Sequence, residues 1–91
     1  MSNYKVEFSD RAKKDIQKFI NAGDTIAVKK IYNLVEELYD HPRTGTGHPE
    51  QLKGYDGNRW SRRISQKHRL VYDIIDDIVV VLVLTAYGHY E

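Results

Sequence analysis

Five basic side chains that could hold a phosphate lie in one short stretch of the chain. Between Gly57 and Tyr72 the sequence contains Arg59, Arg62, Arg63, Lys67 and Arg69 but no acidic residue. Arginine binds phosphate oxygens in pairs through its planar guanidinium group, so such a cluster suits an RNA phosphate. The same arginines could also splay apart into solvent and bind nothing, and composition leaves both interpretations open.

Residues suited to proton transfer lie outside this basic stretch. Glu50 follows a proline in a glycine-rich segment, and His89 and Tyr90 stand near the end of the chain after a long apolar run. Metal-free RNA cleavage needs a base for the ribose 2′-hydroxyl, a cation for the phosphorane and an acid for the departing 5′-oxygen. The chain offers a residue of each type. Taken singly, Glu50 could be a solvated loop acid, His89 a frayed terminal residue and Tyr90 a packing residue.

The sequence offers little support for a metal centre. It has no cysteine, which excludes disulfides and thiolate zinc sites, and His48 and His68 show no ligand spacing. The acids Asp73, Asp76 and Asp77 could hold a divalent cation, but a tight turn explains their clustering better. We therefore expect neither metal nor cofactor.

Length and composition predict one small domain spanning residues 1–91. Hydrophobic residues make up 41% and charged residues 30% of the chain, as in ordinary soluble proteins. No apolar run reaches the length of a membrane span, and the polar start lacks a signal-peptide core. The expected location is the cytoplasm. The net charge of +1 argues against a uniformly basic surface, but one face could still be basic.

The first half of the chain predicts a β-prone run at residues 4–8 followed by two helices. Ser9 and Asp24 are suitable N-caps, and Gly23 can take the left-handed conformation that ends the first helix. The second helix should end near His41, because a proline follows and disfavours helix in the residue before it.

The second half predicts a loop and a three-stranded meander. Residues 42–57 are rich in glycine and proline, with a short extended piece expected at 51–53. Strands are expected at 59–64, 68–75 and 78–87, the last of them apolar on both faces and therefore interior to the sheet. The predicted fold class is α+β, in the order β-α-α-β-β-β, with both N-terminal helices packed on one face of a mainly antiparallel sheet.

This register would place two arginines opposite each other. If Ser65, Gln66 and Lys67 form the turn, Arg63 pairs with Arg69 across the two strands. Like charges in this position destabilise a sheet by roughly 0.2–1 kcal/mol, unless an anion sits between them.

The chain also resembles a known family. The resemblance rests on Pro49-Glu50-x-Leu52-Lys53, Trp60-Ser61-Arg62-Arg63-Ile64, His68-Arg69-Leu70-Val71-Tyr72 and the terminal His89-Tyr90. These motifs are similar to those of the Txe/YoeB toxins in the RelE/ParE superfamily, and the order of elements is that of the RelE-like fold. The resemblance implies the toxin of a type II toxin–antitoxin system, a ribosome-dependent endoribonuclease that cuts mRNA in the decoding site.

By position, the resemblance also implies roles for individual residues. Glu50 would be the general base, His89 the general acid and Arg69 the transition-state arginine. Arg63 and Lys53 would lie near the phosphate, Tyr90 would be the terminal aromatic residue, and Arg62 and Lys67 would add RNA contacts. One departure is that the chain continues to Glu91, whose carboxylate could partly neutralise the site.

The resemblance further implies the partners. They are a cognate antitoxin of the YefM or Phd type, the ribosome and mRNA, with operator DNA bound only through the antitoxin complex. The free toxin would be a monomer or a weak homodimer, and no membrane is involved. The main alternative is a ParE-like toxin that binds DNA gyrase without cutting RNA, and a second is an inactive relative that only represses its operon.

Overall fold

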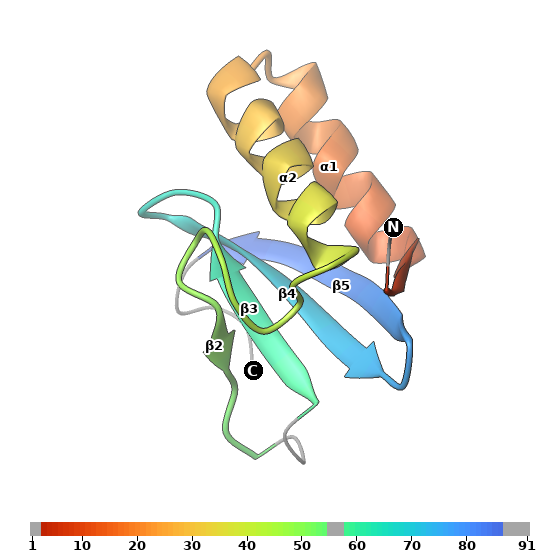
Figure 1. Cartoon of the computed structure of the whole chain (residues 1–91). Coiled ribbons are helices and arrows are strands. Elements are labelled where there is room, and N and C mark those ends of the chain that lie inside the picture. Colours follow the sequence, from red (N-terminus) through yellow and green to blue (C-terminus); the bar gives the residue numbers. More distant parts are fainter. Residues whose placement is uncertain (1–2, 55–57, 87–91) are drawn as a thin grey trace.

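The computed structural model describes residues 3–54 and 58–86 of the chain. Within these residues the elements follow the predicted order (Figure 1): β1 Lys5–Phe8, α1 Asp10–Asn21, α2 Thr25–Leu38, β2 Glu50–Gln51, β3 Arg59–Arg63, β4 His68–Ile75 and β5 Ile78–Ala86. None of the described helices combines the length and apolar character needed to cross a membrane.

Both helices begin at the predicted caps. Ser9 Oγ accepts a hydrogen bond from the Ala12 N–H at 2.9 Å, and Asp24 Oδ1 accepts one from the Ala27 N–H at 3.1 Å. Gly23 has a φ of 70° in the turn between the helices, a conformation that favours glycine. These local signals are confirmed.

The end of α2 differs from the prediction. The helix stops at Leu38 and not near His41. The carbonyl oxygens of His41 and Pro42 instead accept hydrogen bonds from the Arg62 guanidinium and the Tyr72 hydroxyl. Side chains of the sheet therefore satisfy carbonyl groups just beyond the end of the helix.

The described strands form one five-stranded sheet in the order β1-β5-β4-β3-β2. β1 runs parallel to β5, and every other described pair is antiparallel. The predicted pairing of Arg63 with Arg69 is confirmed. The short β2 covers Glu50–Gln51, slightly earlier than the extended piece expected at 51–53, because it pairs with Ser61 and Trp60 of β3.

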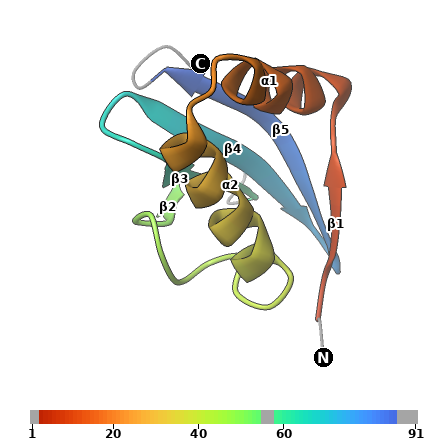
Figure 2. The same cartoon turned by 90° about the horizontal axis from the view of Figure 1, so that it is seen from above.

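The two helices cover one face of the sheet, as Figures 1 and 2 show. Between these layers lies the core, whose most buried members include Ala12, Ile31, Leu34, Leu38, Leu70, Tyr72, Val79 and Val81. β5 lies between β1 and β4, so its predicted interior position is confirmed. Val71 and Val83, which pair with each other on the opposite face, are also buried.

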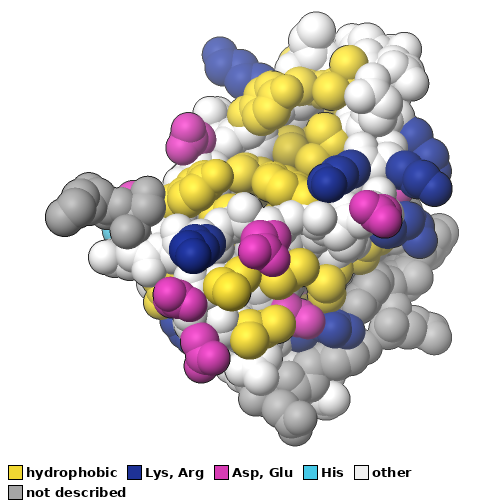
Figure 3. Space-filling model, turned by 90° about the vertical axis from the view of Figure 1, so that its right-hand side faces the viewer, with side chains coloured by type: hydrophobic (Ala, Val, Ile, Leu, Met, Phe, Trp, Pro, Cys, Tyr) yellow, Lys and Arg dark blue, Asp and Glu magenta, His cyan; other side chains and the backbone are white. Residues whose placement is uncertain are grey.

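One outer face combines apolar and charged side chains. In Figure 3, hydrophobic side chains are interspersed with Lys, Arg, Asp and Glu, so this view shows no extended field of one sign. Large exposed hydrophobic residues include Ile20, Ile26 and Tyr32. Ile20 and Tyr32 line a shallow apolar pocket of about 290 Å³ beside the turn between α1 and α2.

Candidate active site

A cleft of about 610 Å³ contains three of the predicted site residues. Its lining consists of Gly45, His48, Pro49, Glu50, Arg63 and Arg69. The first three belong to the loop after α2, and the others come from β2, β3 and β4 in turn. Segments distant in sequence therefore meet around one polar hollow.

Strand register explains how the charged side chains converge. Glu50 pairs with Ser61, and Arg63 pairs with Arg69. Residues that pair directly, and residues two apart along a strand, project from the same face of a sheet. Glu50, Ser61, Arg63 and Arg69 consequently share the face opposite the helices.

Arg69 lies at the centre of this group. Its Nη1 is 3.3 Å from Glu50 Oε1 and 3.3 Å from Ser61 Oγ. The Arg69 side chain is only 13% exposed, whereas that of Glu50 is 63% exposed. An ion pair open to water on one side contributes only about 0–1 kcal/mol to stability, so Glu50 can leave Arg69 at low cost.

Arg63 supplies the second positive charge at the cleft. Its side chain is exposed, while its backbone N–H donates a 2.6 Å hydrogen bond to the Gly47 carbonyl oxygen. Two guanidinium groups on paired positions repel each other, and an anion between them would relieve that repulsion. Together with Glu50, the cleft therefore has one carboxylate and two cations suited to a phosphate ester.

Other predicted site residues lie elsewhere. Lys53, just after β2, and Lys67, in the turn between β3 and β4, are exposed but do not line the cleft. His89 and Tyr90 lie outside the described residues. The described part of β5 ends at Ala86, which pairs with His68, the residue before Arg69.

The predicted RNA contact of Arg62 needs correction. Arg62 is 0% exposed, and its guanidinium donates hydrogen bonds to the Glu37 carboxylate, the Tyr72 hydroxyl and the carbonyl oxygens of His41, Thr44 and Thr46. It projects from β3 to the helix side, like Trp60 and Ile64, which contact the core. A phosphate could reach it only if this network broke.

Arg62 changes the protonation behaviour of its neighbours. Burial alone would raise the pKa of Glu37, but hydrogen bonds from Thr46 and Arg62 and the positive charge of Arg62 outweigh it and lower the pKa. Burial raises the pKa of Tyr72, and Arg62 opposes that rise. Both groups therefore remain in their usual forms at neutral pH, Glu37 as a carboxylate and Tyr72 as a phenol.

Arg59 also has an acidic neighbour. Its Nε and Nη2 atoms lie 2.7 Å and 2.9 Å from the two carboxylate oxygens of Asp73, a bidentate pair. The basic stretch is thus divided, with Arg59 held by Asp73, Arg62 buried, and Arg63 and Arg69 at the cleft. The sequence did not reveal Ser61 or Glu37 as site residues. Ser61 contacts Arg69 because of the strand register, and Glu37 contacts Arg62 because the loop packs against the sheet.

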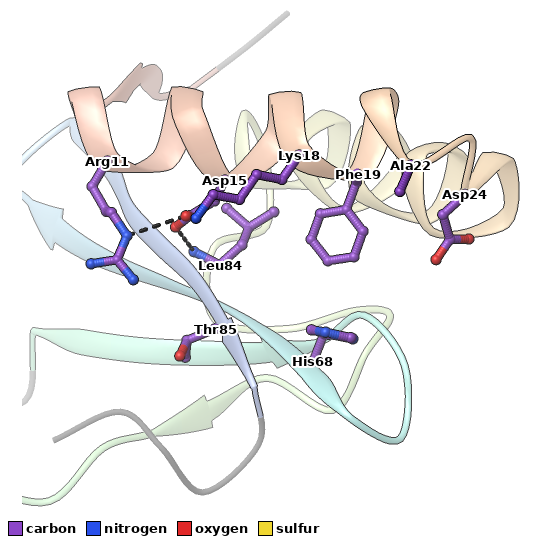
Figure 4. A pocket seen from close by; sticks show the side chains of 9 residues that line it. All are labelled: Arg11, Asp15, Lys18, Phe19, Ala22, Asp24, His68, Leu84 and Thr85. Carbon is purple, nitrogen blue, oxygen red and sulfur yellow. Dashed lines mark hydrogen bonds and ion pairs between the residues drawn. The ribbon is translucent and has the colours of Figure 1, made fainter.

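A second pocket, of about 450 Å³, lies between α1 and the ends of β4 and β5 (Figure 4). Here Asp15 accepts hydrogen bonds from the Leu84 N–H at 3.1 Å and from Arg11 Nε at 3.2 Å. His68 meets the edge of the Phe19 ring, with centroids 5.1 Å apart. These contacts join α1 to the sheet, so Arg11, Asp15 and His68 have structural roles in this pocket. The described residues contain no group of three or more side chains suited to a metal ion.

Comparison with known proteins gives concordant results. Residues 8–90 match the family model of the YoeB-like toxin of bacterial type II toxin–antitoxin systems. Toxin YoeB of Mycobacterium bovis is 43% identical over 61 residues, 67% of this chain and 72% of that toxin. A YoeB dimer structure from Staphylococcus aureus gives a TM-score of 0.78 at 33% identity, covering 98% and 100% of the two chains. A heterotetrameric YoeB–YefM toxin–antitoxin complex from the same species gives 0.75 at 34% identity, covering 96% and 98%.

Proposed function

Because the chain belongs to the YoeB-like toxin family of bacterial type II toxin–antitoxin systems, we propose that it is a ribosome-dependent endoribonuclease that cleaves mRNA in the decoding site. The ribose 2′-oxygen attacks the adjacent phosphorus, and the bond from phosphorus to the 5′-oxygen breaks. The products are a 2′,3′-cyclic phosphate and a 5′-hydroxyl. The chemical step uses no metal ion.

Glu50 is the general base in this proposal. Its carboxylate takes the proton from the 2′-hydroxyl, and its exposure at the cleft lets a ribose approach it. The observation that carries the proposal is this carboxylate at 3.3 Å from the mostly buried Arg69, with Arg63 on the paired position. The base and both cations thereby line the same cleft.

Arg69 and Arg63 hold the negative charge that develops on the phosphorane. Their guanidinium groups are present in the cleft before substrate arrives, so little reorganisation is needed during the reaction. His89 supplies the proton for the departing 5′-oxygen, and Tyr90 stacks or hydrogen-bonds nearby. Lys53 and Lys67 contact phosphates further along the RNA.

Translation in vitro with primer extension tests this proposal. The wild-type protein should produce a discrete cut in ribosome-bound mRNA, and a 2′-deoxy nucleotide at the cut site should abolish it. Arg69→Ala should slow single-turnover cleavage at least as much as loss of an acid–base group, roughly 10²–10⁴-fold. Full activity of that variant would remove the arginine from the mechanism. Inhibition of DNA gyrase without RNA cleavage would instead support the ParE-like alternative.

The partners follow from the family. We propose that a YefM- or Phd-type antitoxin binds this chain, as in the S. aureus toxin–antitoxin complex, and that operator DNA is bound only through that complex. A weak homodimer of free toxin is proposed from the S. aureus dimer. Size-exclusion chromatography with and without the antitoxin tests both assemblies.

A further inference from the structure

The loop between α2 and β2 forms one wall of the cleft and is fastened to the sheet by a buried arginine. Arg62 Nη1 lies 2.7 Å from Glu37 Oε1 and 3.3 Å from the Thr46 carbonyl oxygen. Its Nη2 donates to the Thr44 carbonyl oxygen at 2.8 Å and also to that of His41. One guanidinium therefore links the end of α2 to three points along the loop.

Tyr72 of β4 completes this arrangement. Its hydroxyl accepts a 3.2 Å hydrogen bond from Arg62 Nε and donates a 2.6 Å bond to the Pro42 carbonyl oxygen. Glu37 Oε1 in turn accepts the Thr46 N–H at 2.8 Å. The loop contains no strand or helix between Leu38 and Glu50. Hydrogen bonds from side chains therefore hold its backbone in place.

The next part of the loop lies directly against the cleft. Gly47 accepts the Arg63 N–H at 2.6 Å, and a Cβ at Gly47 would lie 2.9 Å from the Arg63 carbonyl oxygen. Gly45, His48 and Pro49 line the cleft and lead without interruption to Glu50. Displacing the fastened segment would therefore move the residues that directly precede Glu50.

We propose that Arg62 is a positioning residue, which holds this loop so that the Glu50 carboxylate stays beside Arg69. Its effect on loop order follows from the contacts alone, whereas its effect on cleavage rests on the proposed nuclease function. Misplacing a reacting group by about 1 Å can slow a reaction about 10²-fold, so a local loosening is enough to matter. Arg62 itself touches no substrate.

Arg62→Met is the primary test, with Arg59→Met as the matched control. Both changes remove a guanidinium from β3, but that of Arg59 pairs with Asp73 of β4, whereas that of Arg62 holds the loop. Amide hydrogen exchange at Thr46, whose N–H donates to Glu37, should become at least about 10-fold faster in Arg62→Met, while the amides of β4 stay protected. The control should leave loop exchange unchanged.

Single-turnover cleavage on ribosomes provides the second readout. In Arg62→Met the rate constant should fall about 10²-fold, while the toxin concentration giving half the maximal rate changes less than about 3-fold. A general loss of folded protein would lower the reaction amplitude and leave the rate constant of the remaining active molecules unchanged. Arg62→Lys should recover part of the rate, because lysine keeps the charge with fewer donors.

Glu37→Gln covers the case in which Arg62→Met does not fold. Glutamine keeps the size of the side chain and removes the ion pair, so loop exchange and cleavage should shift in the same direction by a smaller factor. If wild-type protein cleaves no mRNA, the proposed function fails, and loop exchange alone decides the positioning role. Unchanged loop exchange in the folded variants, or equally faster exchange in loop and β4, would overturn the inference.

Discussion

Glu50 and Arg69 differ sharply in their exposure to solvent, and this difference suits different tasks. Arg69 is mostly covered and fixed by contacts to Glu50 and Ser61, so its charge stays in place. Glu50 is open to solvent, so a ribose hydroxyl can approach its carboxylate. A fixed cation and an accessible base are what phosphoryl transfer without a metal requires.

Replacing Glu50 by glutamine should separate proton transfer from binding. Glutamine has nearly the same shape but cannot take the 2′-hydroxyl proton, so single-turnover cleavage should slow by roughly 10²–10⁴-fold. Binding to the ribosome should change little, because Arg63 and Arg69 remain. Rapid-quench kinetics and a filter-binding assay measure the two quantities. Cleavage at the wild-type rate would assign the base to another residue.

At the scale of the elements, the site depends on a loop held by residues remote in sequence. Caps and turns contain their own signals, so Ser9, Gly23 and Asp24 could be assigned from the sequence. The pairing of Arg63 with Arg69 followed from the length of one turn. Period-2 alternation with Trp60 and Ile64 could also have placed Arg62 on the inner face. Apart from Tyr72 of β4, its partners could not be predicted, because they come from a loop and a helix end with no periodic signal.

Replacing Gly47 by alanine should destabilise the protein more than replacing Gly23. Both have positive φ, 84° and 70°, a conformation costing other residues roughly 1–2 kcal/mol. A Cβ at Gly47 would also approach the Arg63 carbonyl oxygen to 2.9 Å, whereas nothing lies within 4 Å at Gly23. Gly47→Ala should therefore lower the free energy of unfolding more than Gly23→Ala, as measured by urea denaturation. Equal losses of unfolding free energy in the two variants would show that the loop can shift to accommodate a Cβ at position 47.

The contact between Glu37 and Arg62 should make stability depend on acidity. The folded-state pKa of Glu37 is lowered from its ordinary value of 4.5, so its carboxylate stabilises the fold fully above that pH. This contribution is lost as the pH falls through the lower folded-state pKa. Wild-type protein should therefore lose stability more steeply below about pH 4.5 than Glu37→Gln does. Urea titrations at several pH values test this, with the exposed Glu36→Gln as control, and identical slopes would contradict it.

Over the whole molecule, near-neutral composition conceals a local concentration of positive charge. The net charge is only +1, and acids compensate Arg59 and Arg62 individually. Arg63 and Arg69 instead face one cleft together, with the exposed Glu50 beside them. Attraction of a polyanion depends on such a local field more than on the total charge. The protein can therefore remain nearly neutral while presenting the proposed phosphate site.

This charge distribution predicts how salt should affect binding to mRNA-loaded ribosomes. Each phosphate contact releases counterions, so the logarithm of the binding constant falls linearly with the logarithm of the salt concentration. For single strands the slope is about −0.7 per contact. Arg63→Ala should make that slope less steep by roughly the value for one contact. Arg59→Ala should change it less, because Asp73 already compensates that charge. Binding measured at several potassium concentrations distinguishes the two variants. Equal slopes would mean that RNA affinity depends on the total charge of β3 and not on the charges at the cleft.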